Sequence, residues 1–328
     1  MAGTGTAHLR HSPALLRTEG LEVEFPLAGG GKVHAVSGVS FDLLPGETLA
    51  VVGESGSGKS TVAKAVVQLI RPTAGVVEFE GADLTTLREA ALRELRARLQ
   101  MVFQDPLASL NPWRKVIDVV AEPLNVAKRG ERKDRREAAR SMLRSVGLDP
   151  DVVGHRLASQ LSGGQCQRVS IARALMLEPQ VIICDEPVAA LDVSVQAQIL
   201  NLLNDLKSRL GLSLVFISHD LAVVRVVSDR ILVMYLGKVC EVASAEQLFS
   251  HPQHPYTKLL LDSVPRLGDE PNADSTNPAV EMPSPIDPPT GCRFRTRCPL
   301  ATQRCADEEP VLRQLEGDQF VACHYAGT

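Results

Sequence analysis

The chain has 328 residues, with 35 Lys and Arg against 39 Asp and Glu and a formal net charge of −4. This length allows one large domain with a smaller appendage, or two modest domains. A hydrophobic fraction of 44% is ordinary for a protein with an apolar core. The charge balance argues against a protein that binds nucleic acid mainly through attraction to phosphates.

The sequence does not predict a membrane-spanning segment. No segment approaches the roughly 20 consecutive apolar residues that a membrane-spanning helix needs. Residues 1–17 are polar and rich in Gly and Ala, without the apolar stretch of a signal peptide. We therefore expect a chain that stays in the cytosol, with a disordered N-terminus at residues 1–16. Other chains must supply any membrane-spanning part.

Strands and helices alternate along most of the sequence. In chain order, the hydrophobic pattern predicts strands at 18–25, 39–43 and 48–52, a helix at 59–70, a strand at 75–79, a helix at 87–98, a strand at 101–103, a mostly helical stretch at 113–178, a strand at 181–184, a helix at 195–209 and a strand at 214–217. This alternation predicts an α/β fold with a parallel sheet. Residues 265–291 are rich in Pro, Asp, Asn and Ser, which indicates an extended linker.

A glycine-rich loop after the strand at 48–52 fits the pattern G-x-x-x-x-G-K-[ST]. Glycines let the backbone curl so that successive N–H groups face a phosphate. Lys59 is expected to reach the β- and γ-phosphates, and Ser60 to bind Mg²⁺. A chance match is the alternative, but the loop follows a buried strand and opens a helix, as the chemistry requires. The candidate phosphate-binding residues are Gly53, Glu54, Ser55, Gly56, Ser57, Gly58, Lys59, Ser60 and Thr61.

Two acids end the apolar strand at 181–184. At the carboxyl edge of such a sheet, side chains project into the nucleotide crevice. Asp185 suits a Mg²⁺ ligand, because hard cations prefer carboxylate oxygen. Glu186 is a candidate general base that polarises the attacking water. Taken alone, the pair is more simply a polar strand exit, and the upstream loop is what favours the catalytic interpretation.

A second candidate anion site lies at the start of the helical stretch that begins near residue 165. It offers a hydroxyl and backbone amides from Ser162, Gly163, Gly164 and Gln165. Two separate phosphate-binding elements in one chain make sense if each ATP is enclosed between two copies of the domain.

With these motifs the chain resembles the ATPase subunits of ABC transporters over most of residues 18–260, where residues 161–165 correspond to the family's signature motif. The resemblance implies a P-loop NTPase fold with a parallel core sheet, an antiparallel β subdomain and a helical subdomain at about 105–178. These subdomains would form a nucleotide-binding domain at 17–262, using ATP and Mg²⁺.

Three single residues take roles from the same resemblance. Gln104 resembles the Q-loop glutamine, which senses Mg²⁺ and touches the membrane subunit. Asp192 resembles the D-loop aspartate, which crosses the dimer interface, and His219 resembles the switch histidine, which contacts the γ-phosphate. Each residue alone is more simply structural, and only the order of the motifs supports these roles. The family's adenine-stacking aromatic is missing from residues 28–34, which leaves Phe25, Val33 and His34 as candidates.

Longer strings resemble one branch of the family, the F-type ATPases of oligopeptide or dipeptide permeases. They lie at residues 103–112, 185–196, 251–257 and 283–299, and Ala189 stands where the branch usually has Ser. The resemblance implies a second, D-type ATPase subunit, two transmembrane permease subunits and an extracytoplasmic substrate-binding protein. It places the chain on the cytoplasmic face of the cell membrane, with no nucleic-acid partner. Peptides, glutathione and nickel complexes all stay open as cargo.

Four of the seven cysteines lie in the predicted C-terminal extension at 263–328, namely Cys292, Cys298, Cys305 and Cys323. Their spacing is not the C-x₂-C of zinc ribbons. Four thiolates suit an iron–sulfur cluster or zinc. The resemblance favours a [4Fe–4S] cluster, because related peptide-importer ATPases can hold one. The simpler alternative is four reduced thiols that pack a small tail.

Two other functional classes remain as rivals. A non-transport ABC ATPase, acting in translation or DNA repair, usually carries two ATPase domains or a long coiled-coil insertion, and this chain has one copy of each motif. A P-loop kinase or small-molecule transferase would not need residues 161–165.

Overall fold

The computed structural model describes residues 5–263 and 281–327. The chain divides into two compact parts. We call residues up to 44, 48–87 and those from 218 on the terminal part, and residues 45–47 and 88–217 the middle part. Residues 264–280, which include most of the linker predicted at 265–291, lie outside the described residues.

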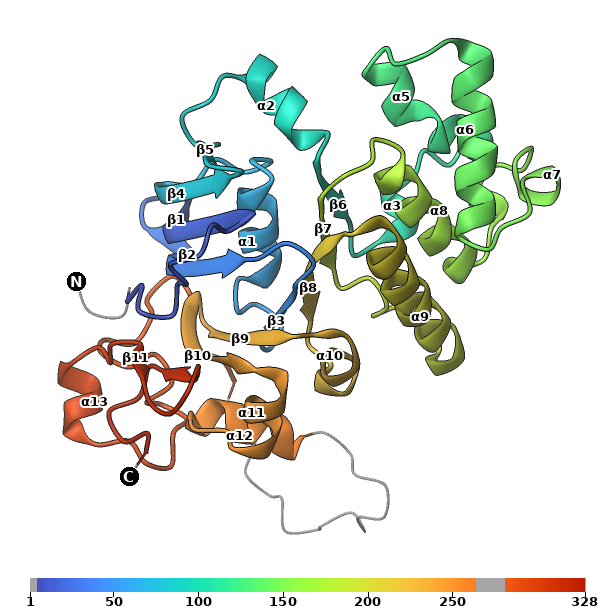
Figure 1. Ribbon diagram of the computed structural model, residues 1–328. Coiled ribbons are helices and arrows are strands. Elements are labelled where there is room, and N and C mark those ends of the chain that lie inside the picture. The colour runs from blue at the N-terminus through green and yellow to red at the C-terminus, as the bar shows by residue number, and fades with distance from the viewer. Residues whose placement is uncertain (1–4, 264–280, 328) are drawn as a thin grey trace. The chain divides into compact units, whose positions relative to one another are not determined.

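An antiparallel sheet forms one layer of the terminal part (Figure 1). Its strands are β1 (Leu16–Pro26), β2 (Lys32–Leu43), β4 (Ala74–Phe79) and β5 (Ala82–Asp83), in the order β2-β1-β4-β5. Along β1, buried residues alternate with less buried ones, which is the pattern of a strand with one face on a core. The predicted antiparallel β subdomain is thereby confirmed.

A second sheet of the terminal part leads into the glycine-rich loop. It contains β3 (Thr48–Val52), β9 (Arg230–Tyr235), β10 (Lys238–Ser244), β11 (Arg313–Gln314) and β12 (Phe320–Val321). β3 runs parallel to β9, whereas β9, β10, β12 and β11 pair antiparallel in that order. Every residue of β3 is buried, as its continuous apolar run predicts. The C-terminal extension therefore adds two strands to the sheet that carries the loop.

The helices of the terminal part are α1 (Lys59–Val66), α10 (Leu221–Val227), α11 (Ala245–Ser250), α12 (Pro255–Asp262) and α13 (Gln303–Asp307). α1 packs against β1 and β2 (Figure 1). It ends earlier than the predicted residue 70, because Gln68 adopts a positive φ of 57° that an α-helix excludes.

The N-terminal stretch differs from expectation. We predicted disorder at residues 1–16, but from residue 5 onward the structure describes a packed segment, and residues 1–4 lie outside the described range. His8 is buried, with its Nε2 2.7 Å from the carbonyl oxygen of Ser40 in β2. Its ring also packs edge-on against Phe320 of β12, at 6.1 Å between centroids. The stretch thus joins β2 to the C-terminal extension.

The middle part is built on three parallel strands, β6 (Leu99–Val102), β7 (Val181–Asp185) and β8 (Ser213–Ser218, whose last residue belongs to the terminal part). They pair in the order β6-β7-β8, and β7 and β8 are buried throughout. Parallel strands that are buried on both faces read as unbroken apolar runs, which is why the sequence predicts them well.

The helices of the middle part are α2 (Glu89–Arg96), α3 (Pro106–Ser109), α4 (Val116–Val120), α5 (Glu122–Val126), α6 (Arg132–Ser145), α7 (Pro150–Val153), α8 (Gly163–Leu175) and α9 (Val193–Leu210), with a 3₁₀ turn at Ala158–Gln160. Those from α3 to α8 lie within the stretch at about 105–178 that was predicted as a helical subdomain. α8 lies at their centre, in contact with α3, α4, α5, α6, α9 and β6.

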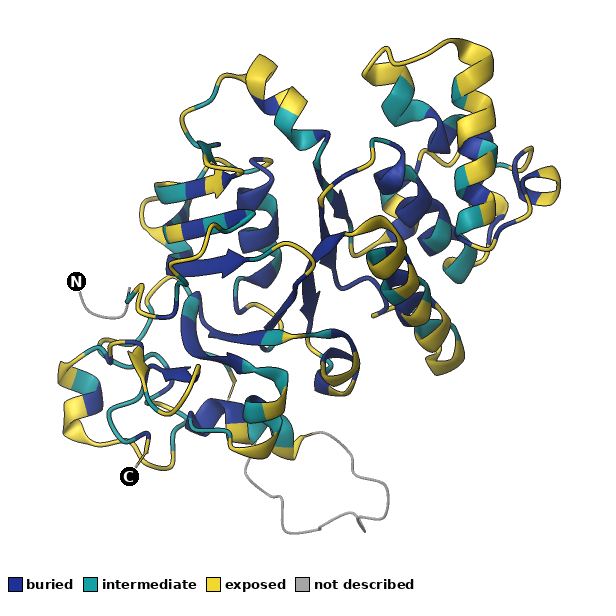
Figure 2. Ribbon diagram, viewed as in Figure 1, coloured by how far each residue is buried: buried dark blue, intermediate teal, exposed yellow. Residues whose placement is uncertain are grey.

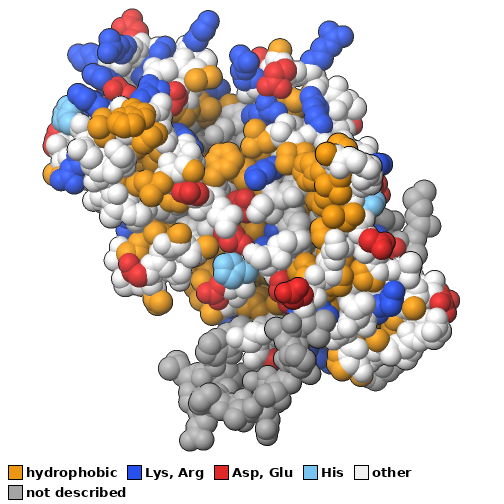
Figure 3. Space-filling model, turned by 180° about the vertical axis from the view of Figure 1, so that it is seen from behind, with side chains coloured by type: hydrophobic (Ala, Val, Ile, Leu, Met, Phe, Trp, Pro, Cys, Tyr) orange, Lys and Arg blue, Asp and Glu red, His pale blue; other side chains and the backbone are white. Residues whose placement is uncertain are grey.

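The outer face of α6 is exposed and basic (Figures 2 and 3). Only Ala139 and Leu143 of this helix are buried. Lys and Arg side chains gather over α5 and α6, at the upper left of Figure 3. Several of them pair with acids, as Arg136 does with Asp118 at 2.8 Å.

None of the helices in the described ranges is both long and apolar enough to span a bilayer.

Candidate functional site

The glycine-rich loop at residues 53–60 adopts a backbone that only glycine allows at three positions. Gly53, Gly56 and Gly58 have φ of 153°, 81° and 100°. A Cβ on Gly53 would lie 2.1 Å from the carbonyl oxygen of Met234, and one on Gly58 would lie 2.3 Å from that of Ala35. The loop is therefore pressed against neighbouring backbone, which fixes its curl.

The start of α1 is the second feature of this loop. α1 begins at Lys59, and no side chain caps its first turn. The N–H groups of an uncapped first turn, together with the helix dipole, suit an anion. Ser60 and Thr61 lie half-buried in that turn, and Ser55 and Gly56 are exposed.

Lys59 and Ser57 show how the loop is held internally. Lys59 is buried, and its Nζ donates to the carbonyl oxygens of Gly53 at 2.7 Å and Glu54 at 2.9 Å. Among the described residues, the buried Oγ of Ser57 has no hydrogen-bond partner. A cradle of this shape, with a lysine and an unpartnered hydroxyl, fits a polyphosphate group.

A contact that the sequence did not predict joins this loop to the C-terminal extension. Arg297 donates from Nη1 to Glu54 Oε2 at 2.7 Å and from Nη2 to Oε1 at 3.0 Å. The backbone N–H of Glu54 donates to the hydroxyl of Tyr256 at 2.8 Å. The ion-paired residues lie 243 positions apart in the chain, so no local pattern could indicate the pair.

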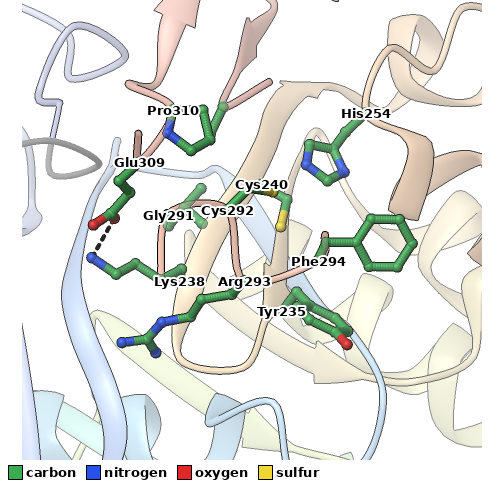
Figure 4. A pocket seen from close by; sticks show the side chains of 12 residues that line it. Tyr235, Lys238, Cys240, His254, Gly291, Cys292, Arg293, Phe294, Glu309 and Pro310 are labelled. Atoms are coloured by element: carbon green, nitrogen blue, oxygen red, sulfur yellow. Dashed lines mark ion pairs between the residues drawn. The ribbon is translucent and has the colours of Figure 1, made fainter. Parts of the chain in front are cut away.

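A small aromatic cluster joins the extension to β9 and α12, and the pocket beside it is shown in Figure 4. The rings of Tyr235, Tyr256 and Phe294 lie 4.7–5.3 Å apart between centroids. Figure 4 shows Tyr235, Cys240, His254 and Phe294 gathered on one side of a pocket. The charged side of the pocket includes an ion pair between Lys238 and Glu309 at 2.6 Å.

The four cysteines of the extension line a second cavity together, with His254 and Tyr325 among its other lining residues. None of them forms a disulfide. Burial raises the pKa of Cys292 to about 11, and it raises the pKa values of Cys298 and Cys323 as well. In the described ranges, no three His, Cys, Asp or Glu side chains are placed to hold one metal ion. The four cysteines singled out from the sequence therefore share one cavity in the structure, as free thiols.

His219 follows β8 and is exposed. The next residue, Asp220, caps α10 by accepting a hydrogen bond from the N–H of Ala222 at 2.8 Å. The histidine is therefore held at the junction between a buried strand and a capped helix.

In the middle part, the two predicted acids lie at the carboxyl end of β7. Asp185 is its last residue and is buried. Glu186 is also buried, has a φ of 44°, and donates its N–H to the carbonyl oxygen of Ile217 at 3.0 Å. Such a φ is rare for a residue other than glycine and is common at functional sites.

Gln104 joins these acids, although it lies 82 positions earlier in the chain. Its Nε2 donates to Glu186 Oε2 at 3.0 Å. The side chain itself is exposed and begins the segment that leads to α3. Two of the predicted site residues are thereby in direct contact.

The turn at residues 162–165 starts α8 with reciprocal hydrogen bonds. Gln165 N donates to Ser162 Oγ at 3.3 Å, and Ser162 N donates to Gln165 Oε1 at 3.1 Å. This capping box defines the start of the helix. Ser162 and Gly163 remain exposed, so they can meet a ligand from outside the chain.

The same turn packs on the residues that begin α9. A Cβ on Gly164 would lie 2.6 Å from Cγ1 of Val195. Asp192 caps α9, accepting hydrogen bonds from Val195 N at 3.0 Å and from Ser194 Oγ at 2.8 Å. These bonds lower the pKa of Asp192, which therefore carries a negative charge at neutral pH.

The three candidates for stacking on adenine separate in the structure. Phe25 and Val33 face each other across β1 and β2 and therefore share one face of that sheet. His34 belongs to the opposite face, where its Nδ1 lies 3.0 Å from Glu24 Oε1. Phe25 is 37% exposed. The apolar Phe25–Val33 pair is thus distinct from the polar His34 position.

Two family descriptions match this chain. Residues 36–189 match the ABC transporter family, and residues 240–305 match the C-terminal region of oligopeptide/dipeptide transporters.

Curated relatives match over nearly the whole length. The oligopeptide transport ATP-binding protein OppF of Salmonella typhimurium is 47% identical, over 93% of this chain and 95% of its own length. The di/tripeptide transport ATP-binding protein DppF of Pseudomonas aeruginosa is 48% identical, over 91% of this chain and 92% of its own. Among solved structures, the dimeric ATP-binding cassette MJ0796, in a post-hydrolysis state with ADP and phosphate, is 30% identical over 70% of this chain and 98% of its own, with a TM-score of 0.64.

Proposed function

This chain belongs to the ABC transporter family as an ATP-hydrolysing subunit of a peptide importer, and on that premise we propose that each ATP is bound between two such subunits. The loop at residues 53–61 of one subunit binds the phosphates from one side. The turn at residues 162–165 of the other subunit closes the site. The exposure of Ser162 and Gly163 supports this arrangement, since a turn that serves its own chain would be covered by it.

Within each site, Lys59 meets the β- and γ-phosphates, and His219 contacts the γ-phosphate. Ser60, Asp185 and Gln104 would offer Mg²⁺ oxygen atoms, the donors that a hard cation prefers. When bound, the ion neutralises charge on the phosphates. Asp192 lies at the interface between the two subunits, where its cap fixes the start of α9.

Glu186 acts as the general base that takes a proton from the attacking water. The observation that carries the transport function is the hydrogen bond from Gln104 to Glu186. Through it, the residue that does the chemistry touches the segment expected to contact the membrane subunits. Binding of ATP closes the pair of subunits, and hydrolysis removes the γ-phosphate that joins them, so the pair reopens.

The contact with the membrane subunits is formed by residues 104–113. Leu107 is 51% exposed and Trp113 is 82% exposed, and large apolar side chains so placed favour a protein partner. The partners are two transmembrane permease subunits and a related D-type ATPase, with an extracytoplasmic substrate-binding protein. The chain works at the cytoplasmic face of the cell membrane. Its nucleotide-binding domain spans residues 17–262, and its extension spans 263–328.

Copurification tests this assembly. We expect Trp113→Asp to abolish copurification with the permease subunits while leaving ATP binding intact. Val152→Asp is the matched control, because Val152 is also apolar and 52% exposed but lies on α7. If the Trp113 variant copurifies as well as the control, the proposed contact is wrong.

We also propose that Cys292, Cys298, Cys305 and Cys323 hold a [4Fe–4S] cluster. In such a cluster each thiolate binds a different iron, so the thiols need to surround one cavity rather than converge on one ion. The four cysteines do line one cavity. Burial raises the pKa values of Cys292, Cys298 and Cys323, so thiolates at these three positions need a nearby cation.

Anaerobic purification tests the cluster. We expect an absorbance band near about 400 nm and bound iron, both lost in Cys298→Ser. Protein without that band and without iron, or protein with zinc instead, would contradict the cluster.

A further inference from the structure

We propose that Arg297, in the C-terminal extension, is a positioning residue for ATP, because it neutralises Glu54 and holds the phosphate-binding loop. The inference rests on the function proposed for residues 53–61. It makes the extension a part of the nucleotide site of this chain.

The ion pair has the geometry of a specific contact. Both terminal nitrogens of Arg297 donate to the two oxygens of Glu54, at 2.7 and 3.0 Å. The side chain of Arg297 is 11% exposed and that of Glu54 is 29% exposed. Such a bidentate arginine–carboxylate pair fixes the relative orientation of the two side chains, which a lysine would not do.

The guanidinium of Arg297 also contacts two aromatic rings. Its Cζ lies 5.7 Å from the centroid of Tyr235 and 5.9 Å from that of Phe294, and both rings are fully buried. These cation–π contacts hold the cation in position independently of Glu54. Arg297 is therefore a fixed charge to which the loop is attached, rather than a mobile surface side chain.

Electrostatics gives the pair a role in binding. Glu54 is the second residue of a loop that must accept a highly negative triphosphate. An unpaired carboxylate there repels the phosphates, and the repulsion is stronger at a partly buried position than in water. Arg297 supplies the opposite charge and cancels this repulsion.

The backbone of Glu54 links the ion pair to the lysine of the loop. Its carbonyl oxygen accepts hydrogen bonds from Lys59 Nζ at 2.9 Å and from Ser57 N at 3.2 Å. Its N–H donates to Tyr256 Oη at 2.8 Å. A displacement of Glu54 would therefore change the position of the Lys59 amine.

A second arginine of the extension reaches the loop indirectly. Arg293 donates to the carbonyl oxygen of Leu236 and, at 2.9 Å, to Ser37 Oγ. Gly237, which follows Leu236, donates its N–H to the carbonyl oxygen of Ser57 at 2.9 Å. Figure 4 shows Arg293 pointing away from the aromatic side of the pocket, beside Lys238. The extension thus supports the loop at two points.

Both arginines adjoin a cysteine that lines the shared cavity. Arg293 follows Cys292, and Arg297 precedes Cys298. The residues that support the loop are therefore direct sequence neighbours of the cysteine cavity.

The test is Arg297→Ala in the full-length subunit, purified with its partner subunits. We expect the KM for ATP and the dissociation constant of a fluorescent ATP analogue to rise by about 3- to 10-fold, with kcat within about twofold. Arg295→Ala is the matched control, because Arg295 lies two residues earlier and donates to Thr290 instead of Glu54. Wild-type ATP affinity in Arg297→Ala would overturn the proposal.

The double variant Glu54→Gln/Arg297→Ala separates charge from folding. Removal of the unpaired carboxylate should restore part of the lost ATP affinity. If Arg297→Ala caused only a structural defect, removal of this charge would restore nothing. Affinity no better than in Arg297→Ala would overturn the electrostatic role. If Arg297→Ala does not fold, Arg297→Lys replaces it, and we expect an intermediate KM.

Lys59→Ala distinguishes this inference from the proposed function. If Lys59→Ala binds ATP normally, the assignment of the loop itself fails, and the inference fails with it. If Lys59→Ala loses ATP while Arg297→Ala binds it normally, only the role of Arg297 is overturned.

Discussion

At the scale of single residues, the proposed chemistry depends on Glu186. Its side chain is buried beside Asp185, its φ is positive, and its carboxylate accepts a hydrogen bond from Gln104. The sequence alone indicates this glutamate, because it follows an apolar strand in a chain with a phosphate-binding loop. The contact with Gln104 could not be predicted, since nothing local links residues that lie 82 positions apart.

Glu186→Gln should bind ATP normally but hydrolyse it about 10²- to 10⁴-fold more slowly, because the amide cannot take a proton from water. The bound ATP should then trap a closed dimer, seen as a doubled mass in sedimentation. Glu178→Gln is the control, since Glu178 is an exposed acid with a similar φ of 55°. Turnover near that of the wild type in Glu186→Gln would remove Glu186 from the role of base.

At the scale of elements, the starts of α8 and α9 form one packed unit. The capping box of Ser162 and Gln165 lies next to the cap made by Asp192, and Gly164 leaves no room for a side chain beside Val195. The two motifs at these helix starts therefore keep a fixed position relative to each other.

Gly164→Ala should disturb that unit, since its Cβ would lie 2.6 Å from Val195 Cγ1. We expect turnover to fall about 10- to 100-fold through misplacement of the turn at 162–165, while ATP still binds to the loop at 53–61. Val195→Ala in the same chain removes the obstructing methyl groups and should restore most of the turnover. If the double variant is as slow as Gly164→Ala, the packing explanation is wrong.

The N-terminal stretch gives the structure a pH dependence. Burial lowers the pKa of His8, Arg230 lowers it further, and the carbonyl of Ser40 and the carboxylate of Asp42 oppose the shift. The unfolded chain, with an ordinary histidine pKa near about 6.5, therefore binds protons more readily than the folded chain. The contribution of neutral, buried His8 to the free energy of unfolding is therefore fully present above the unfolded-state pKa. It is lost as the pH falls below that value.

Urea unfolding between about pH 7.5 and about pH 5.5 measures this effect. As the pH falls, we expect the free energy of unfolding to decrease less steeply in His8→Gln than in the wild type, because glutamine does not titrate. Equal slopes for the two proteins would show that His8 does not contribute.

Elements with a strong local pattern were predicted well, and those set by distant partners were not. The strand at 48–52 was predicted to the residue, because it is a continuous apolar run with every side chain buried. β2 begins at Lys32 rather than at 39, because its first half is held by pairing with β1 and not by an apolar pattern of its own. The packed stretch around His8 depends on Ser40 and Phe320, which no local pattern identifies.

At the scale of the whole molecule, residues near the C-terminus are continuous with the sheet that carries the glycine-rich loop. β12 pairs with β10, and the buried carboxylate of Glu241 accepts a hydrogen bond from Gln319 of the extension at 2.7 Å. The motifs predicted from sequence are divided between the two parts. The terminal part carries the phosphate-binding loop and His219, and the middle part carries Gln104, the two acids, the turn at 162–165 and Asp192.

The central claim is that the turn at 162–165 completes the ATP site of another subunit. Turnover by Ser162→Asp, purified with its partner subunits, tests this most directly, because an added negative charge there should repel the γ-phosphate held by the neighbouring chain. We expect turnover to fall by at least about 100-fold, with ATP binding to the loop at 53–61 unchanged. Turnover equal to that of the wild-type assembly in this variant would contradict the shared site and the transport mechanism built on it.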